Sequence, residues 1–467
     1  MAHVYVLFWF DVEDCTVPQS DDCTKRLATI LTENGVRGTF KVVGQKARML
    51  EQRVRYTVID ALQKQDIGFH SNWHGLRPQI MEYLGPLDWD EGVAEFERRE
   101  GPGLEDVRRI FDVNPSTYGQ PGGNWAPHVF PVLRTWKIPT YVSGFGYVGL
   151  DCQPFWYGGV LCTSHMYGKR LNGAQQRHLM GLGFECGRPG ELERHKETFT
   201  RSLEQLSGDG GLISILNHPC QLVLEEWFST YMKPRELTEA GYRHVEAFVK
   251  WVLSHDNVKT TCASELQALY PDRAQGRSFS RDELQVIARN LSDEINFQCL
   301  DGITVSAAEA FGMLVNALGA YIANGELPTG VPCRPAYNPT RQHDEPIRTA
   351  SIPWDTFCAS VETVMHYVSK TEQVPNSVEM DAAPVAPGDY LAALARTVGR
   401  LLDGSPPPDT VDIEPAVCRF EDYVDESAAK GAWKGSMAPE NFTAPNLIEL
   451  AKLEAWTLKP AVLRRAP

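Results

Sequence analysis

Two histidines separated by three residues are the strongest chemical signal in the sequence. His70 and His74 follow the short apolar segment Asp66–Phe69. In a helical turn, residues at this spacing project to one side, where two imidazoles can bind one metal ion at about 2.0–2.1 Å. An isolated pair of this kind is often a coincidence of the surface or core. Here the pair follows a short strand, and the carboxyl ends of parallel strands are where α/β active sites form.

Acidic residues directly follow another apolar segment. Asp11, Glu13 and Asp14 come at the end of, or just after, the run that begins at Val4. In an extended chain, Asp11 and Glu13 point to the same side. One carboxylate can complete a two-histidine metal site, and a second can act as general base on metal-bound water. Glu13 is the ligand if the strand continues, and Asp14 if the chain turns after Val12. The alternative is a solvated strand end with a helix cap.

A third polar site follows the apolar segment Leu212–Leu216, which leads into Asn217, His218 and Pro219. A histidine has an unperturbed pKa of about 6.5, so His218 can hold a proton near neutrality and act as a general acid. A single histidine at a strand end is more often structural, but this one is expected at the same sheet edge as the other two sites.

These three sites require a fold in which several strands end at one edge. In residues 1 to about 270, strand-like apolar segments alternate with helical periodicity. We expect strands at Val4–Phe10, Thr39–Val43, Asp66–Phe69 and Leu212–Leu216, and helices at Cys23–Glu33 and Gln45–Gln65. Such alternation with short connections predicts βα units and a parallel sheet.

A polar stretch at residues 271–282 ends this pattern, and we place a domain boundary near residue 270. Residues 271–467 are predicted to be mainly helical, with internal repeats at 305–331, 352–378 and 385–411. Each repeat opens with a β-branched residue, has a proline 23 positions later and closes with a valine. Such units pack against their neighbours. A helix followed by Pro-Xaa-Xaa-Val resembles the pseudomurein-binding repeat, which implies glycan or cell-wall binding.

The composition argues against several classes of partner. The 467 residues carry 45 Lys and Arg against 60 Asp and Glu, a net charge of −15, which disfavours nucleic acid and anionic membrane surfaces. No apolar segment reaches the roughly 18 residues of a membrane span. The first apolar run lacks the flanks of a signal peptide, and the 11 scattered cysteines form no CxxC pair. We therefore expect a cytoplasmic protein with reduced thiols.

Taken in the order in which they occur along the chain, the three sites resemble the motifs of the polysaccharide deacetylase family, carbohydrate esterase family four. The strand end at Asp11 resembles its first motif, His70 to His74 its His-Ser/Thr-Xaa-Xaa-His motif, and the segment ending in His218 its late histidine. Residues 34–44, NGVRGTFKVVG, are similar to the segment between the first two motifs. The resemblance covers residues 1 to about 270.

The resemblance implies a distorted (β/α) barrel and one divalent metal ion. One carboxylate, His70 and His74 would hold the ion, Asp11 would be the general base, and His218 would protonate the leaving amine. Ligands of this type suit zinc, and also cobalt or nickel.

The sequence departs from the family at its first and third motifs, and the fourth, with Asp and Trp, has only a loose candidate at 151–156. The family's first motif has adjacent aspartates, whereas Asp11 is followed here by Val-Glu-Asp, which leaves the choice between Glu13 and Asp14 open. The third motif normally has an arginine two residues before a proline, where it positions the base. Gly119 occupies that position here, so the base must be oriented in another way.

Four residues near these motifs are candidates for substrate binding. Tryptophan rings stack on sugars, although core packing is the alternative for any tryptophan. The four candidates are Trp73, Gln120, Asn124 and Trp125.

We therefore expect a metal-dependent hydrolase of a carbon–nitrogen amide bond, acting by N-deacetylation of an amino sugar or small saccharide. One alternative is hydrolysis of a non-sugar amide or cyclic imide, as in allantoinase-like enzymes. Another is an inactive glycan-binding protein that uses the C-terminal repeats. The C-terminal helical domain is also the candidate surface for a homo-oligomer.

Overall fold

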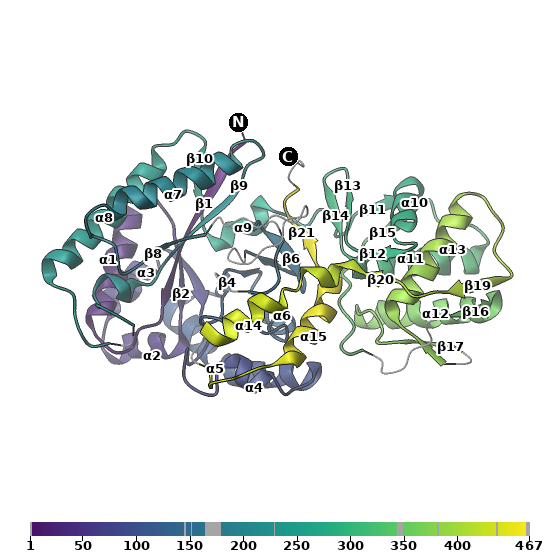
Figure 1. The fold of residues 1–467 in the computed structure, drawn as a ribbon, viewed down its shortest axis with the longest axis horizontal. Coiled ribbons are helices and arrows are strands. Elements are labelled where there is room, and N and C mark those ends of the chain that lie inside the picture. Colours follow the sequence, from purple (N-terminus) through teal and green to yellow (C-terminus); the bar gives the residue numbers. More distant parts are fainter. Residues whose placement is uncertain are drawn as a thin grey trace.

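A mainly parallel sheet organises the first part of the chain in this computed structural model (Figure 1). The structure describes residues 2–143, 146–150, 152–163, 179–227, 229–342, 349–380, 383–435 and 438–463. The strands are β1 (Val4–Val12), β2 (Thr39–Val42), β3 (Asp66–Phe69), β4 (Thr117–Tyr118), β5 (Thr140–Tyr141), β6 (Phe155–Tyr157), β7 (Val160–Cys162), β8 (Leu179–Leu182), β9 (Gly211–Asn217), β10 (Val258–Thr261) and β21 (Lys459–Pro460).

The strand order is β21-β6-β7-β5-β4-β3-β2-β1-β9-β8, and β10 also pairs with β1. All pairs are parallel except those of β6 with β7 and with β21. Because β1 has strands on both sides and is buried on both of its faces, it is apolar along nearly its whole length. In the described residues, β8 and β21 are separate edges. The fold is therefore the distorted, incompletely closed barrel that the motifs implied.

Helices connect and cover these strands. They are α1 (Gln19–Glu33), α2 (Gly44–Gln52), α3 (Tyr56–Leu62), α4 (Ile80–Leu84), α5 (Trp89–Phe111), α6 (Val129–Thr135), α7 (Glu191–Leu206), α8 (Arg235–Leu253) and α9 (Ala263–Leu269). Among the described helices, none combines the length and apolar character needed to cross a bilayer. All eleven cysteines are free thiols.

The prediction of one helix over residues 45–65 was wrong, because the chain breaks between α2 and α3. Val54 has a left-handed backbone, with φ 55°, and is exposed. The break brings two arginines to the buried carboxylate of Asp21, with Arg53 at 3.1 Å and Arg55 at 3.7 Å. Pairing this buried charge offsets the cost of the strained residue.

Each of the three C-terminal repeats forms a strand, a helix and a second strand. The first comprises β14 (Ile303–Val305), α11 (Ala307–Asn324) and β15 (Gly330–Pro332). The second comprises β16 (Ala350–Pro353), α12 (Trp354–Thr371) and β17 (Val378–Met380). The third comprises β18 (Ala383–Val385), α13 (Pro387–Leu402) and β19 (Thr410–Ile413). In all three, the closing valine of the repeat lies in the second strand.

A fourth unit of the same kind precedes these repeats and was missed from the sequence. It comprises β11 (Ser278–Ser280), α10 (Arg281–Asn290) and β13 (Gln298–Leu300). The antiparallel pairs β11–β15 and β13–β14 join it to the first repeat, just as β16–β19 and β17–β18 join the second repeat to the third. Its helix is shorter and the proline is missing, so it does not fit the spacing of the others. β12 (Glu294–Ile295) pairs with β20 (Val417–Cys418).

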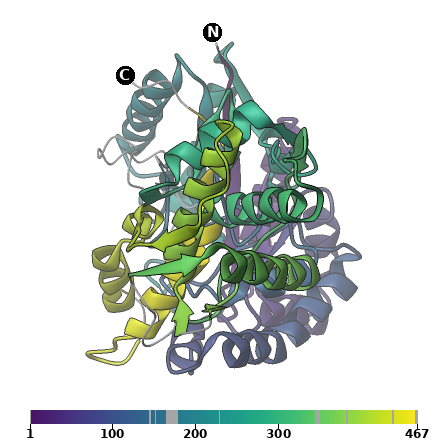
Figure 2. The same ribbon diagram turned by 90° about the vertical axis from the view of Figure 1, so that its right-hand side faces the viewer.

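The end of the chain returns to the barrel after the repeats (Figures 1 and 2). It comprises α14 (Glu426–Gly435), α15 (Pro445–Glu454) and β21. The Tyr157 hydroxyl donates to the Ala451 carbonyl at 2.8 Å. The buried ammonium of Lys459 lies 2.8 Å from Asp272 and 2.6 Å from Glu309 of α11. Hydrogen bonds and ion pairs thus join the barrel, the first repeat and the C-terminal strand.

The buried carboxyl of Glu454 makes this junction sensitive to pH. Burial raises the pKa of Glu454 from 4.5 to about 8, although Arg134 and Thr457 lower it. Its contribution to stability is therefore full below pH 4.5 and is lost as the pH rises through about 8. We expect the free energy of unfolding in urea to fall over this range by a few kcal/mol, on the order of 1.4 kcal/mol per unit of pKa shift.

Glu454→Gln should remove this part of the pH dependence, because the amide does not ionise. Glu449→Gln, at an exposed position on the same helix, is the matched control and should keep the wild-type slope. Equal slopes for wild type and Glu454→Gln would show that the carboxyl ionises freely in the folded protein.

Candidate active site

The three predicted sites meet at the carboxyl ends of β1, β3 and β9. Parallel register pairs Phe10 with Asn217 of β9 and Val12 with Val42 of β2, which in turn pairs with Phe69 of β3. Glu13 and His70, which follow β1 and β3, therefore lie at one level. His218, which follows β9, lies level with Asp11, two residues earlier on β1.

The carboxylate of Glu13 lies beside both histidines of the pair. Its Oε2 is 3.2 Å from His70 Nε2 and 2.8 Å from His74 Nε2. His70 Nδ1–H donates to the Gly119 carbonyl at 2.6 Å, which leaves the Nε2 lone pair of a neutral imidazole facing Glu13. Burial lowers the pKa of His70, despite the nearby Asp11, and favours that neutral form. A lone pair facing a carboxylate oxygen needs a cation between them, so this donor set fits a divalent ion.

Asp14 is turned away from these ligands. One of its oxygens accepts the Thr16 N–H at 3.3 Å, and the other accepts the Val17 N–H at 3.4 Å. The carboxylate thereby orders the turn that leads into α1. The geometry favours Glu13 over Asp14 as the ligand, although β1 ends at Val12 and does not continue to Glu13.

The helical turn predicted between His70 and His74 does not form. Ser71 and His74 have left-handed backbones, with φ 67° and 53°. The carbonyls of Ser71 and Asn72 accept N–H groups from the start of α2, and the Asn72 N–H donates to Glu100. These bonds occupy the backbone groups that a helical turn would use. The two histidines therefore converge through a strained loop held from outside.

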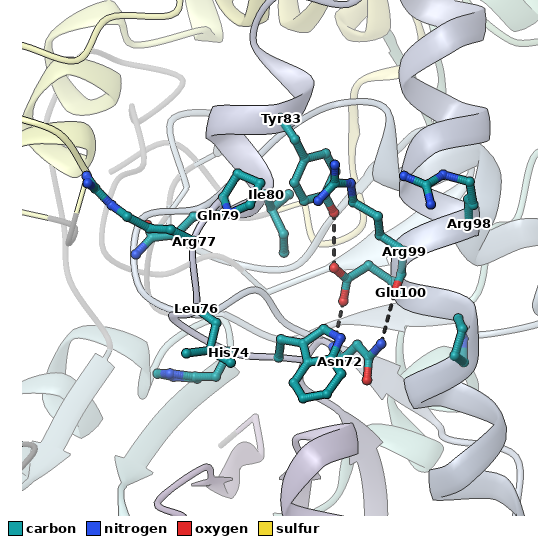
Figure 3. A pocket seen from close by; sticks show the side chains of 13 residues that line it. Asn72, His74, Leu76, Arg77, Gln79, Ile80, Tyr83, Arg98, Arg99 and Glu100 are labelled. Carbon is teal, nitrogen blue, oxygen red and sulfur yellow. Dashed lines mark hydrogen bonds between the residues drawn. The ribbon is translucent and has the colours of Figure 1, made fainter.

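Glu100 anchors this loop from α5. Its carboxyl accepts the Asn72 N–H at 2.6 Å and the Tyr83 hydroxyl at 3.0 Å (Figure 3). Burial raises the pKa of Glu100 to about 7, although both hydrogen bonds lower it. This contact could not be predicted from the sequence, because it joins residues 28 positions apart.

Asp11 lies next to the candidate ligands Glu13, His70 and His74 but has different neighbours of its own. Its Oδ2 is 3.4 Å from His218 Nε2, and its Oδ1 is 2.9 Å from the ammonium of Lys41. Burial raises the pKa of Asp11, but His70, Lys41 and His218 together outweigh burial and hold it below its ordinary value. An anionic carboxylate near neutral pH is what a general base requires. Lys41 was missed from the sequence, where its signal is a lysine inside the apolar strand segment TFKVV.

Two indole rings stand at the mouth of the site. A cavity of about 290 Å³ is lined by Glu13, His74, Trp73 and Trp227. Trp73 is 47% exposed and Trp227 is 40% exposed, and the Trp227 ring lies 4.8 Å from that of His218. A second cavity of about 600 Å³ shares Trp73 and His74 and extends toward α4 and α5 (Figure 3). The site thus has room and aromatic surface for an organic substrate.

The other three residues predicted to bind substrate are buried. The Gln120 side chain donates to the Gly122 carbonyl at 3.0 Å, and the Asn124 side chain donates to the Pro121 carbonyl at 2.9 Å. The Trp125 ring packs 4.4 Å from that of Tyr147 in the core. These three side chains order the segment after β4. Of the four candidates, only Trp73 lines the described cavity, whereas Gln120, Asn124 and Trp125 are buried.

A second cluster of potential ligands is satisfied without a metal ion. Gly187 N–H donates to His244 Nδ1 at 3.2 Å, so neutral His244 carries its proton on Nε2 and donates to His195 Nδ1 at 2.9 Å. His195 Nε2–H then donates to Glu185 at 3.0 Å. Burial lowers the pKa of His244 to about 4, which agrees with a neutral ring. Cys186 lies beside this chain of hydrogen bonds.

The sequence matches no protein-family model and none of the curated proteins. Solved structures do resemble it. A putative polysaccharide deacetylase from Mycobacterium smegmatis is 17% identical, with a TM-score of 0.39 over 57% of this chain and 90% of that one. Puue allantoinase is 13% identical, with a TM-score of 0.39 over 58% and 92%.

A third solved structure is a mutant of a CE4 family pseudoenzyme from Bacillus anthracis with restored enzymatic activity. It is 14% identical, with a TM-score of 0.30 over 56% of this chain and 67% of that one. The resemblance predicted from the motifs is therefore found among solved structures, at low identity. At these TM-scores, a function has to be argued from the geometry of the site.

The choice between the two acidic residues can be tested by metal binding. We expect the wild type to bind one equivalent of zinc, cobalt or nickel in calorimetry. Glu13→Ala should weaken that affinity by more than the roughly 10–100-fold that loss of an outer partner costs. Asp14→Ala, one residue away, is the matched control and should bind as the wild type does. The reverse pattern would make Asp14 the ligand.

Proposed function

We propose that this protein is a divalent-metal-dependent hydrolase of a carbon–nitrogen amide bond, which removes the acetyl group from an N-acetylated amino sugar or small saccharide. The observation that carries the proposal is the convergence around Glu13 of His70 and His74 on one side and, on the other, of a second, separately held carboxylate, Asp11, with a histidine, His218. Ligands, a base and an acid from three strand ends are the set that hydrolysis of an amide needs.

The residues divide into ligands and proton carriers. Glu13, His70 and His74 would hold the ion, which when bound polarises a carbonyl and lowers the pKa of water. Asp11 accepts the proton of the attacking water, since His70, Lys41 and His218 outweigh the effect of burial and keep its carboxylate anionic, and the contact with Lys41 holds it in place. His218 donates a proton to the leaving nitrogen. Each proton transfer contributes typically about 10²–10⁴-fold in rate.

The indole rings at the cavity support a saccharide substrate. Trp73 and Trp227 present exposed aromatic surface beside His74 and His218, where a sugar ring could stack. The cavity of about 290 Å³ would also hold a cyclic imide, so the allantoinase-like alternative is tested alongside. An inactive glycan-binding protein would not need the paired Asp11 and His218.

Replacing the base should separate catalysis from metal binding. We expect the metal-loaded wild type to release acetate from N-acetylated amino sugars or their short oligomers. Asp11→Asn should lower kcat by about 10²–10⁴-fold while metal stoichiometry is retained. His218→Ala should have an effect of similar size. The measurement is acetate release beside metal analysis of the same samples.

The products decide between the three functions. A ring-opened acid from a cyclic imide, with no acetate from any sugar, would replace the deacetylase proposal by the imide hydrolase. Sugar binding without turnover at full metal occupancy would identify an inactive binding protein.

A further inference from the structure

We infer that Lys41 is a positioning residue of this site. Its ammonium, supplied by β2, orients the carboxylate of Asp11, and the lack of a side chain at Gly119 provides the space for it. The inference rests on the proposed function, because it takes Asp11 to be the group that accepts the proton.

Lys41 is held by three contacts in the interior. It is 1% exposed, and its Nζ lies 2.9 Å from Asp11 Oδ1 and 3.0 Å from the carbonyl oxygen of Val142, to which it donates. The same nitrogen lies 4.2 Å from the centroid of the Trp9 ring. A buried ammonium costs free energy unless its charge and its N–H groups are satisfied. Carboxylate, carbonyl and ring together fix its place.

The register of the sheet dictates this pairing. Asp11 and Lys41 are direct partners in the parallel ladder of β1 and β2. Their side chains therefore leave the same face of the sheet side by side. The ammonium holds Oδ1 of Asp11, while Oδ2 lies toward His218. The cation thus selects which carboxylate oxygen is left for the proton transfer.

Gly119 makes this arrangement sterically feasible. A Cβ atom at this position would lie 2.3 Å from Lys41 Nζ and 2.2 Å from the Val142 carbonyl oxygen. Any side chain there would displace the ammonium. The backbone of Gly119 is used as well, since its carbonyl accepts from His70 Nδ1. Position 119 is where the family motif predicts an arginine, and here a positive charge reaches the base from the neighbouring strand instead.

The test is Lys41→Met in the full-length, metal-loaded protein. Methionine keeps the length of the side chain and removes the charge. We expect kcat for acetate release to fall by about 10²-fold, the effect of misplacing a reacting group by about 1 Å, with KM and metal stoichiometry unchanged. In an Asp11→Asn background, the same change should cause no further loss, because Lys41 acts through Asp11.

Lys46→Met is the matched control. Lys46 is also 1% exposed and forms a buried ion pair, at 2.6 Å with Asp21, which keeps Arg53 as a second partner. Its loss should lower stability but leave kcat at the wild-type level. An equal loss of kcat in both lysine variants would overturn the inference, since any buried lysine would then have the same effect.

The remaining outcomes are also decisive. Wild-type kcat in Lys41→Met would overturn the positioning role and leave the proposed function intact.

If Lys41→Met is too unstable to assay, the double variant Asp11→Asn/Lys41→Met should be more stable than Lys41→Met alone, because it leaves no unpaired buried charge. A double variant that is no more stable would show that the pair is not formed. If the wild type binds metal but hydrolyses no N-acetylated sugar, the proposed deacetylase function is wrong. The role of Lys41 in that reaction is then overturned with it.

Discussion

The parallel register of β1 with its neighbours is the constraint on which the site depends. It places Asp11 beside Lys41 on β2 and sets Phe10 level with Asn217 on β9, so that the proposed acid and base and the Lys41 ammonium come together without any long loop. A slip of one residue would turn each of these side chains to the opposite face. The apolar residues of β1 are buried on both faces of the strand, and this burial fixes the register. The core and the chemistry are therefore specified by the same strand.

Charge balance gives the site a second constraint. Asp11 and Glu13 are buried carboxylates, and Lys41 is one buried ammonium beside neutral His70. These groups carry one net negative charge in a region from which water is largely excluded. A bound cation would offset that charge, whereas an apolar ligand would not. In the proposed function, Glu13 sits against two imidazoles because a cation from outside the chain would be its electrostatic partner.

Strand ends were predictable from the sequence, because an apolar run that stops at a polar residue indicates the end of a buried strand in a parallel sheet. The strand ends near Asp11, His70 and His218 were found in this way. Features that depend on contacts between distant segments were not predictable. The loop from His70 to His74 is shaped by Glu100, and the break after α2 by Asp21. The pairing of Lys41 with Asp11 needed the register, and the fourth C-terminal unit needed the pairing of its strands.

The position of β21 in the chain has a consequence for biosynthesis. β21 covers the edge strand β6 of the barrel, yet it comes after all four repeat units in the sequence. During translation, the edge of β6 therefore stays uncovered until the repeats have left the ribosome. An open strand edge in a nascent chain invites pairing with other chains. The repeats thus delay completion of the barrel. A ribosome that stalls within them would release a barrel whose β6 edge is unpaired and prone to aggregation.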